Sequence, residues 1–173
     1  MERLKVLFVT IWYPSREQPL AGLFVREHAR AAQLYDDVVV LHCAGLDPSP
    51  RGIWRVEREH DQAIAGGIPT FRVLYRRSPV PKTSYLLNLW SALRATRLIL
   101  GRSFRPDIVH GHVYTAAVTA VLIGRIHRLP VVLTEQCTDF PRRVLHGATL
   151  WKARLAFRAA DIVLPVSRSL QRA

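Results

Sequence analysis

The sequence contains little cysteine and no long apolar run. Its two cysteines, Cys43 and Cys137, lie far apart and follow no metal-binding spacing, so we expect reduced thiols in a cytosolic protein. The longest purely apolar stretches, such as residues 120–123, fall far short of the ~20 residues that span a bilayer. Charged residues and a strand-like run without a small-residue cleavage site follow Met1, so no signal peptide is expected.

Acidic residues are also scarce. The chain has 13 Asp and Glu against 25 Lys and Arg, a formal charge of +12. Such an excess attracts polyanions such as nucleic acid, anionic lipid headgroups or sugar nucleotides, and it is equally compatible with arginines scattered over tolerant surface sites. The sequence contains no recognition helix, no aromatic-basic RNA motif and no zinc spacing, so nucleic acid is not an expected partner.

The first predicted turn lacks the glycine signatures of nucleotide-binding folds. The stretch FVTIWYPSREQPLAGLFVREHARAA, residues 8–32, runs from a buried strand through a polar loop into an amphipathic helix, with Gly22 just before the helix. It matches neither GxGxxG nor GxxxxGK[ST], and no acidic residue follows at the offset of a ribose contact. A nicotinamide-dependent dehydrogenase is therefore not expected.

What the sequence does contain is a regular alternation of buried strands and helices. With 173 residues, of which 49% are hydrophobic, one domain spanning 1–173 can bury a core. The patterns predict strands at 5–10, 37–42, 107–110, 131–134 and 162–166, helices at 23–34, 85–100, 115–127 and 144–159, and an edge strand pair within 53–75 around Gly66 and Gly67. This order predicts one Rossmann-like α/β domain with a doubly wound, mostly parallel sheet.

Two of the predicted helices have an apolar stripe that we expect to face the sheet. For 23–34 the stripe consists of Phe24, His28, Ala31 and Ala32. For 85–100 it consists of Leu86, Leu89, Trp90, Leu93 and Leu100.

Polar side chains gather where the predicted parallel strands end. Ligands of open α/β sheets bind beyond these carboxyl ends, so we expect the site there. The first strand ends at Thr10 and leads into the loop before Gly22; the residues at the other strand ends are His110, His112, Thr134, Glu135, Gln136, Thr138 and Ser167.

Four motifs follow one another in a characteristic order: a strand, long loop, glycine and helix, then PDIVHGH, then PVVLTEQ, then AADIVLPVS. This order resembles the N-terminal, acceptor-side domain of family 4 glycosyltransferases, which are retaining enzymes of the GT-B fold. The likeness spans nearly the whole chain and is least diagnostic over residues 47–82. The resemblance implies an enzyme that transfers a hexose-like sugar from a nucleotide-sugar donor to a glycan, lipid-linked or polysaccharide acceptor. It implies no metal and no other cofactor. It also implies a C-terminal donor-binding domain, which we expect to be absent from this chain, leaving the isolated fragment inactive.

The resemblance assigns roles to individual residues. It places Ala21 and Gly22 near the donor phosphates, with Ala21 standing where a Gly-Gly pair is common, and it places His112 against the transferred sugar as the catalytic candidate. Gln136 stands where relatives often have histidine; an amide can position substrate but cannot carry a proton charge near neutrality. The remaining predicted substrate-binding residues are His110, Glu135, Thr138 and Ser167.

Several of these residues also have a simpler interpretation. Gly22 can be a helix-entry glycine without a ligand, Glu135 a helix cap, and His110 a strand-end residue with a mainly structural role. His110 and His112 share one face of a strand and could chelate a metal, but a third ligand is not evident, so no metal is expected.

Arginines near the predicted helix 85–100 leave two interpretations open. Together with leucines and a tryptophan, Arg94, Arg97, Arg102 and Arg105 could form a face that docks on an anionic membrane, with Arg142 and Arg143 nearby in the chain. Alternatively, the helix simply covers the sheet and Trp90 belongs to the core, which we favour. The alternative function is therefore a non-catalytic basic module that docks on anionic membrane or another polyanion. The expected location is the cytoplasm, with the inner face of the cytoplasmic membrane as a second possibility.

Overall fold

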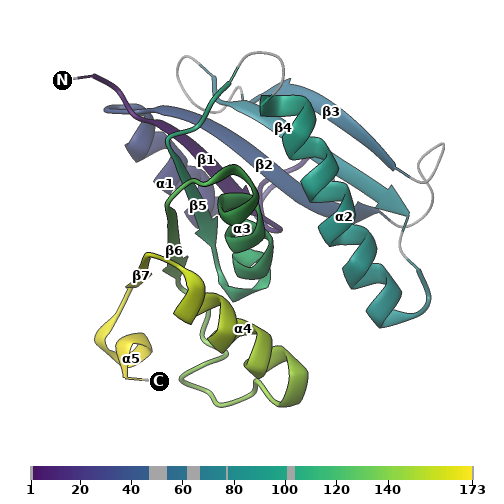
Figure 1. The fold of residues 1–173 in the computed structure, drawn as a ribbon, viewed down its shortest axis with the longest axis vertical. Coiled ribbons are helices and arrows are strands. Elements are labelled where there is room, and N and C mark those ends of the chain that lie inside the picture. Colours follow the sequence, from purple (N-terminus) through teal and green to yellow (C-terminus); the bar gives the residue numbers. More distant parts are fainter. Residues whose placement is uncertain (1, 47–53, 62–66, 77, 101–103, 173) are drawn as a thin grey trace.

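Seven strands form one sheet in the order β3-β4-β2-β1-β5-β6-β7 (Figure 1). The computed structural model describes residues 2–46, 54–61, 67–76, 78–100 and 104–172. The elements are β1 (Lys5–Thr10), α1 (Leu23–Gln33), β2 (Asp37–Leu46), β3 (Trp54–His60), β4 (Pro69–Arg76), α2 (Pro81–Leu100), β5 (Ile108–His112), α3 (Tyr114–His127), β6 (Val131–Glu135), α4 (Gly147–Ala159), β7 (Ile162–Pro165) and α5 (Arg168–Gln171). The β3–β4 pair is antiparallel and the other pairs are parallel, which confirms the predicted Rossmann-like α/β fold.

The centre of the sheet is β1, whose apolar sequence KVLFVT is buried from Val6 to Thr10. Parallel strands covered on both faces require such continuous apolar runs. After β1 the chain passes through α1 to β2 on one side, whereas β5 pairs with β1 on the other side. The carboxyl ends of β1 and β5 therefore flank the topological switch point, where doubly wound sheets bind ligands.

Helices cover the two faces of the sheet unequally. Figure 1 shows α2, α3 and α4 on one face, and α1 lies on the other. Alternation along β1 divides the core accordingly: Leu7 and Val9 belong to the cluster under α2 and α3, and Val6 and Phe8 to the smaller cluster under α1.

The predicted stripe of α1 packs on the sheet only in part, through His28, whose ring lies 5.6 Å from that of His112, and Ala32. Val25 and Ala29 are fully buried, whereas Phe24 is 37% exposed and packs edge-on against Trp12 at 6.2 Å between ring centroids. The buried side of the helix is therefore centred on Val25 and Ala29.

The predicted face of α2 is likewise correct only in part, since Leu93 of that stripe packs against the larger core cluster. The buried side consists of small or β-branched residues, whereas Leu86 is 61% and Trp90 45% exposed; the buried residues are Ser91, Ala92, Ala95, Thr96 and Ile99. Small side chains let the helix lie close to the sheet. Trp90 therefore does not belong to the core: it packs against Trp54 of β3 at 6.1 Å, and the Arg94 guanidinium lies over both rings.

The edge strand pair predicted within 53–75 is confirmed by the antiparallel β3–β4 pairing, in which Trp54 lies opposite Tyr75. Gly66 and Arg102, named in the predictions, lie outside the described residues. Among the described helices, none combines the length and the apolar composition needed to cross a bilayer.

Candidate functional site

The two histidines of β5 lie on the sheet face that α1 covers. Their rings stack at 4.3 Å between centroids, and His112 also lies 4.5 Å from Phe8 and 5.6 Å from His28 of α1. The Nε2 atom of His110 is 2.7 Å from the Thr134 hydroxyl. The His112 side chain is fully buried, and neither of its ring nitrogens has a hydrogen-bond partner in the structure.

Burial holds both imidazoles neutral. It lowers the pKa of His110 to about 4, with a smaller contribution from His28. It lowers the pKa of His112 well below the ordinary value, with His110 and His28 adding to the effect. No group of three or more metal-ligating side chains occurs within the described ranges. The proposed sugar contact of His112 stays a prediction.

Gly22 is required by the packing of the loop on the helix. It precedes α1 with φ of 67°, and a Cβ there would overlap the Trp12 carbonyl and lie 2.7 Å from the Tyr13 nitrogen. This geometry supports the interpretation as a helix-entry glycine, and a donor contact stays a prediction. The neighbouring Ala21 donates its N–H to the Gln18 carbonyl at 3.2 Å.

Glu135 acts as a cap inside the structure. Its carboxylate accepts from the Tyr114 N–H at 2.7 Å, at the start of α3, and from the Cys137 N–H at 2.6 Å. Burial raises the pKa of Glu135, while these backbone N–H groups act in the opposite direction. Of the two interpretations of this residue, the geometry favours the helix cap.

Three further predicted site residues follow β6 and β7. Ser167 caps α5 by accepting from the Leu170 N–H at 3.2 Å. The Gln136 amide nitrogen is buried without a hydrogen-bond partner, and Thr138 is exposed. Their proposed substrate contacts stay predictions.

The turn between β5 and α3 contains an unusual backbone conformation. Val113 has φ of 66° and ψ of 146°, which is uncommon for a β-branched residue. Its N–H donates to the Thr134 carbonyl at 2.8 Å, which holds the turn against β6. Such outliers often occur at functional sites, and this one lies at the switch point.

A pocket of about 520 Å³, here called the loop pocket, lies between the loop after β1 and the ends of β2, β3 and β4. Ala21 is the predicted site residue in its lining. Its charged and imidazole side chains are Glu17, His42, Arg55, Glu57 and Arg72.

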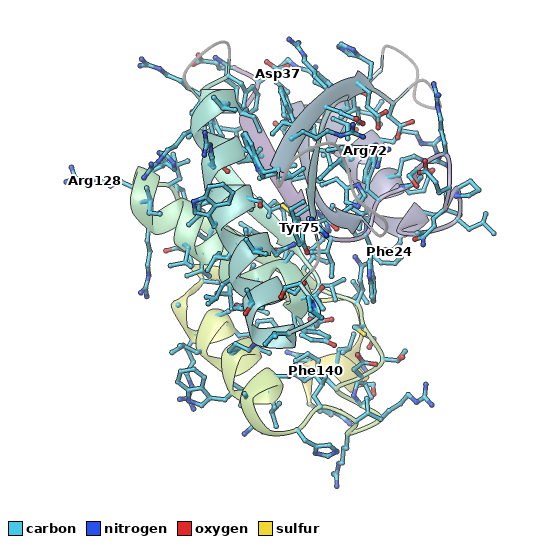
Figure 2. The ribbon with its side chains drawn as sticks, turned by 90° about the vertical axis from the view of Figure 1, so that its right-hand side faces the viewer. Phe24, Asp37, Arg72, Tyr75, Arg128 and Phe140 are labelled. Carbon is cyan, nitrogen blue, oxygen red and sulfur yellow. The ribbon has the colours of Figure 1, made fainter. Side chains whose placement is uncertain are left out.

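Arg72 ties the loop after β1 to the sheet (Figure 2). Its guanidinium contacts the Pro14 carbonyl, the Glu59 carboxylate and, at 2.7 Å, the Nδ1 atom of His42. The His42 Nε2 atom is 3.2 Å from the Ile11 carbonyl, so the neutral tautomer with its proton on Nε2 satisfies both contacts. Burial first, and Arg72 second, lower the pKa of His42 to about 4.

A second pocket of about 490 Å³, here called the helix pocket, lies among the first turns of α2, α3 and α4. It meets the loop pocket at Ile11, Tyr75 and Asn88, which line both. The Asn88 amide donates to the Tyr75 hydroxyl at 3.0 Å and to the Cys43 carbonyl at 3.4 Å. The two pockets therefore adjoin one another along the carboxyl ends of the strands, and the pair is here called the bent groove. A third pocket of about 500 Å³, between α4, β7 and α5, includes Glu135.

The sequence predictions missed the residues that shape this groove. Asn88 carried a usable signal, since it is an amide inside an apolar helical pattern and lies one turn before the buried Ala92. Arg72 and Lys152 gave no signal, because their partners come from elements that are distant in the sequence.

Comparisons with known proteins agree with this architecture. Residues 21–173 match the family described as glycosyl transferase 4-like domain. The chain is 27% identical to the teichuronic acid biosynthesis glycosyltransferase TuaC of Bacillus subtilis, a name given as putative, over 97% of this chain and 45% of that protein. It is 26% identical to a glycogen synthase of Mycobacterium tuberculosis over 87% of this chain and 40% of that protein. The chain thus spans less than half the length of these relatives.

Solved structures share the fold at low sequence identity. A sucrose-phosphate synthase of Thermosynechococcus elongatus superposes with a TM-score of 0.57 at 12% identity, covering 93% of this chain and 42% of that one. A UDP-N-acetylglucosamine 2-epimerase superposes with a TM-score of 0.58 at 15% identity, covering 99% and 44%. These structural likenesses show the fold. The family match over residues 21–173 shows in addition that the chain belongs to the glycosyl transferase 4-like domain family.

Proposed function

We propose that the chain is the acceptor-side half of a retaining glycosyltransferase that moves a hexose from a nucleotide sugar to a glycan, lipid-linked or polysaccharide acceptor. The observation that carries this proposal is the bent groove at the carboxyl ends of the strands, beside the β1–β5 switch point, in a member of this family. Doubly wound sheets bind their ligands at this edge.

The donor nucleotide belongs, in this proposal, to a second domain outside these residues. The support is that the chain covers only 45% and 40% of the length of its named relatives. An open half-site cannot exclude water around a reacting sugar nucleotide. The isolated chain should therefore transfer no sugar.

Positioning rather than base catalysis suits the histidines of this half. Burial keeps His110 and His112 neutral, and the His112 nitrogens have no partner in the structure, so a sugar hydroxyl reaching them would satisfy a buried polar group. In same-face transfer the departing phosphate takes the acceptor proton, and the protein orients the reactants. The reaction then needs neither metal nor another cofactor.

The test compares sugar transfer by this 173-residue chain with transfer by the product of its complete reading frame. A panel of nucleotide sugars is incubated with candidate acceptors, with and without a chelator, and product anomers are identified by NMR. We expect transfer only by the complete protein, with retention of configuration and no effect of chelation. Efficient transfer by the short chain, or inversion, would contradict the proposal.

A second candidate function, docking on an anionic membrane at its cytoplasmic side, is favoured by the outer face of α2. Leu86, Trp90 and Leu98 are 61%, 45% and 47% exposed, and Arg94 and Arg97 lie on the same helix. Exposed apolar and cationic side chains together suit a headgroup layer. Co-sedimentation with phosphatidylglycerol vesicles should be strong at low salt and weak with phosphatidylcholine; equal binding to both vesicles would exclude this docking mode.

A further inference from the structure

We propose that the helix pocket selects an acceptor sugar that carries an anionic group, a carboxylate or a phosphate, and that Lys152 is the residue that recognises the anion. This inference rests on the proposed function, because it names the class of substrate that the acceptor-side groove would take. It concerns one lobe of that groove, whose lining combines a single cation with aromatic and hydroxyl groups.

Lys152 is the only charged residue in the pocket lining, and it has no carboxylate partner among the described residues. Its ammonium group lies 3.9 Å from the centroid of the Tyr85 ring. A cation–π contact holds an ammonium in place while leaving its other N–H groups free. The pocket therefore offers an oriented and unneutralised positive charge.

The surrounding electrostatics favour an anion over a cation. The first turns of α2 and α4 contain no acidic residue and line this pocket, so their positive helix ends add to the charge of Lys152. At the start of α3 two carboxylates outside the lining are already hydrogen-bonded to Tyr114: Glu135 accepts from its N–H at 2.7 Å, and Asp139 accepts from its hydroxyl at 2.8 Å. A bound anion would meet one ammonium and no free carboxylate in the lining.

The remaining lining suits a sugar ring. Three tyrosines, an amide and three aliphatic hydroxyls surround the space: Tyr75, Tyr85, Asn88, Tyr114, Ser84, Thr115 and Thr149. Aromatic faces contact the C–H side of a pyranose, and the polar groups pair with its hydroxyls. The volume of about 490 Å³ falls within the ~300–1,000 Å³ usual for small-molecule sites.

The position of Lys152 also orients such an acceptor. It belongs to α4, which contributes no residue to the lining of the loop pocket. The junction lies at Ile11, directly after β1 and beside the switch point. An anion held at Lys152 would therefore point the other end of the sugar toward the reacting edge.

The experiment measures binding of glucuronate, glucose 6-phosphate, glucose and inorganic phosphate to the 173-residue chain by ligand-detected NMR. We expect the two anionic sugars to bind at least about tenfold more tightly than glucose, as a charge-assisted hydrogen bond implies. The substitution Lys152→Gln should abolish this preference, and Lys152→Arg should retain it. The matched control is Lys5→Gln, at the exposed start of β1.

The outcomes are decisive in both directions. A preference for glucuronate alone or for the phosphate ester alone supports the proposal and names the anion. Equal binding of glucose and the anionic sugars, unchanged binding in Lys152→Gln, or competition by inorganic phosphate as strong as by glucose 6-phosphate would overturn it. Sugar transfer by the complete protein tests the proposed function separately: transfer without an anionic preference removes only this inference, and an anionic preference without transfer removes only the proposed function.

Discussion

Two glycines with the same backbone conformation differ in what surrounds them. Gly22 and Gly147 have φ of 67° and 54°, but a Cβ at Gly22 would overlap the Trp12 backbone, whereas nothing lies within 4 Å of one at Gly147. A left-handed conformation alone costs a non-glycine residue about 1–2 kcal/mol. The clash adds to that cost only at the loop before α1.

We predict that Gly22→Ala lowers the free energy of unfolding by about 3–4 kcal/mol, because strain and overlap add. The matched control Gly147→Ala should cost only about 1–2 kcal/mol. Urea titrations followed by circular dichroism measure both. Equal losses in the two variants would show that the loop relaxes around the new methyl group, and that Gly22 is dispensable for packing.

Buried imidazoles make the fold sensitive to acid. Burial lowers the pKa values of His42 and His110 from 6.5 to about 4 in the folded state. The unfolded chain therefore binds protons first as the pH falls, and the stability present above about pH 6.5 is lost progressively down to about pH 4. At about 1.4 kcal/mol per pH unit, each histidine removes on the order of 3 kcal/mol.

We predict a steep fall of the urea midpoint between about pH 6.5 and pH 4. The variant His110→Gln should show a shallower fall, even if it is less stable at pH 7. The exposed His146, changed to Gln, serves as the control and should keep the full pH dependence. A midpoint that does not change over this range would mean that water reaches the rings and that they titrate normally.

At the scale of elements, the sequence predicts strand positions better than helix faces. Each predicted strand is found, because continuous apolar runs between turn residues leave few alternatives; β1 and its neighbours are examples. The buried faces of α1 and α2 agree with those predicted only in part, since Phe24, Leu86 and Trp90 were assigned to them but are exposed. In α2 close approach to the sheet requires Ala92 and Ala95 there, and Trp90 is displaced outward.

The candidate site, like the fold, could be predicted from the sequence only in part. That polar residues gather at the carboxyl ends of the strands follows from topology and was predictable. The groove itself depends on Arg72, Asn88 and Lys152, whose partners lie on other elements, so no local pattern contains it. The cap formed by Glu135 was foreseen as an alternative because a carboxylate before a helix commonly takes that role.

The loop after β1 depends on one guanidinium from β4. Arg72 joins the Pro14 carbonyl, His42 and Glu59, so it connects the loop to β2 and β3 at once. We predict that Arg72→Lys loosens this loop, since an ammonium cannot make all three contacts in the same plane. Trypsin cleavage after the exposed Arg16, followed by mass spectrometry, should become about tenfold faster.

The matched control is Arg55→Lys, which keeps the charge in the same pocket but replaces a residue whose ion pair, among the described residues, is with Glu57. It should leave the cleavage rate at Arg16 unchanged. Equal rates in the wild type and in Arg72→Lys would show that the loop is held by the Gly22 packing alone.

At the scale of the whole molecule, the two faces of the sheet are covered to different extents. The cluster under α2 and α3 extends from β4 to β6, whereas the cluster under α1 stops near β1 and β2. On the α1 side, the outer strand β7 exposes apolar side chains: Ile162 is 53%, Leu164 47% and, just after the strand, Val166 53% exposed. β7 is also an edge strand of the sheet.

An exposed apolar edge strand promotes association between copies of a chain. We therefore predict that the 173-residue chain self-associates with rising concentration and binds a hydrophobic dye such as ANS. The substitution Leu164→Lys should reduce both, with a change in unfolding free energy of less than about 1 kcal/mol, because the side chain is already half exposed. Val163→Lys on the opposite, partly buried face is the contrast, and should destabilise the fold instead.

Sedimentation velocity at several concentrations measures association. If the chain stays monomeric at all of them, its charge of +12 is sufficient to keep copies apart, and the exposed strand carries no such liability.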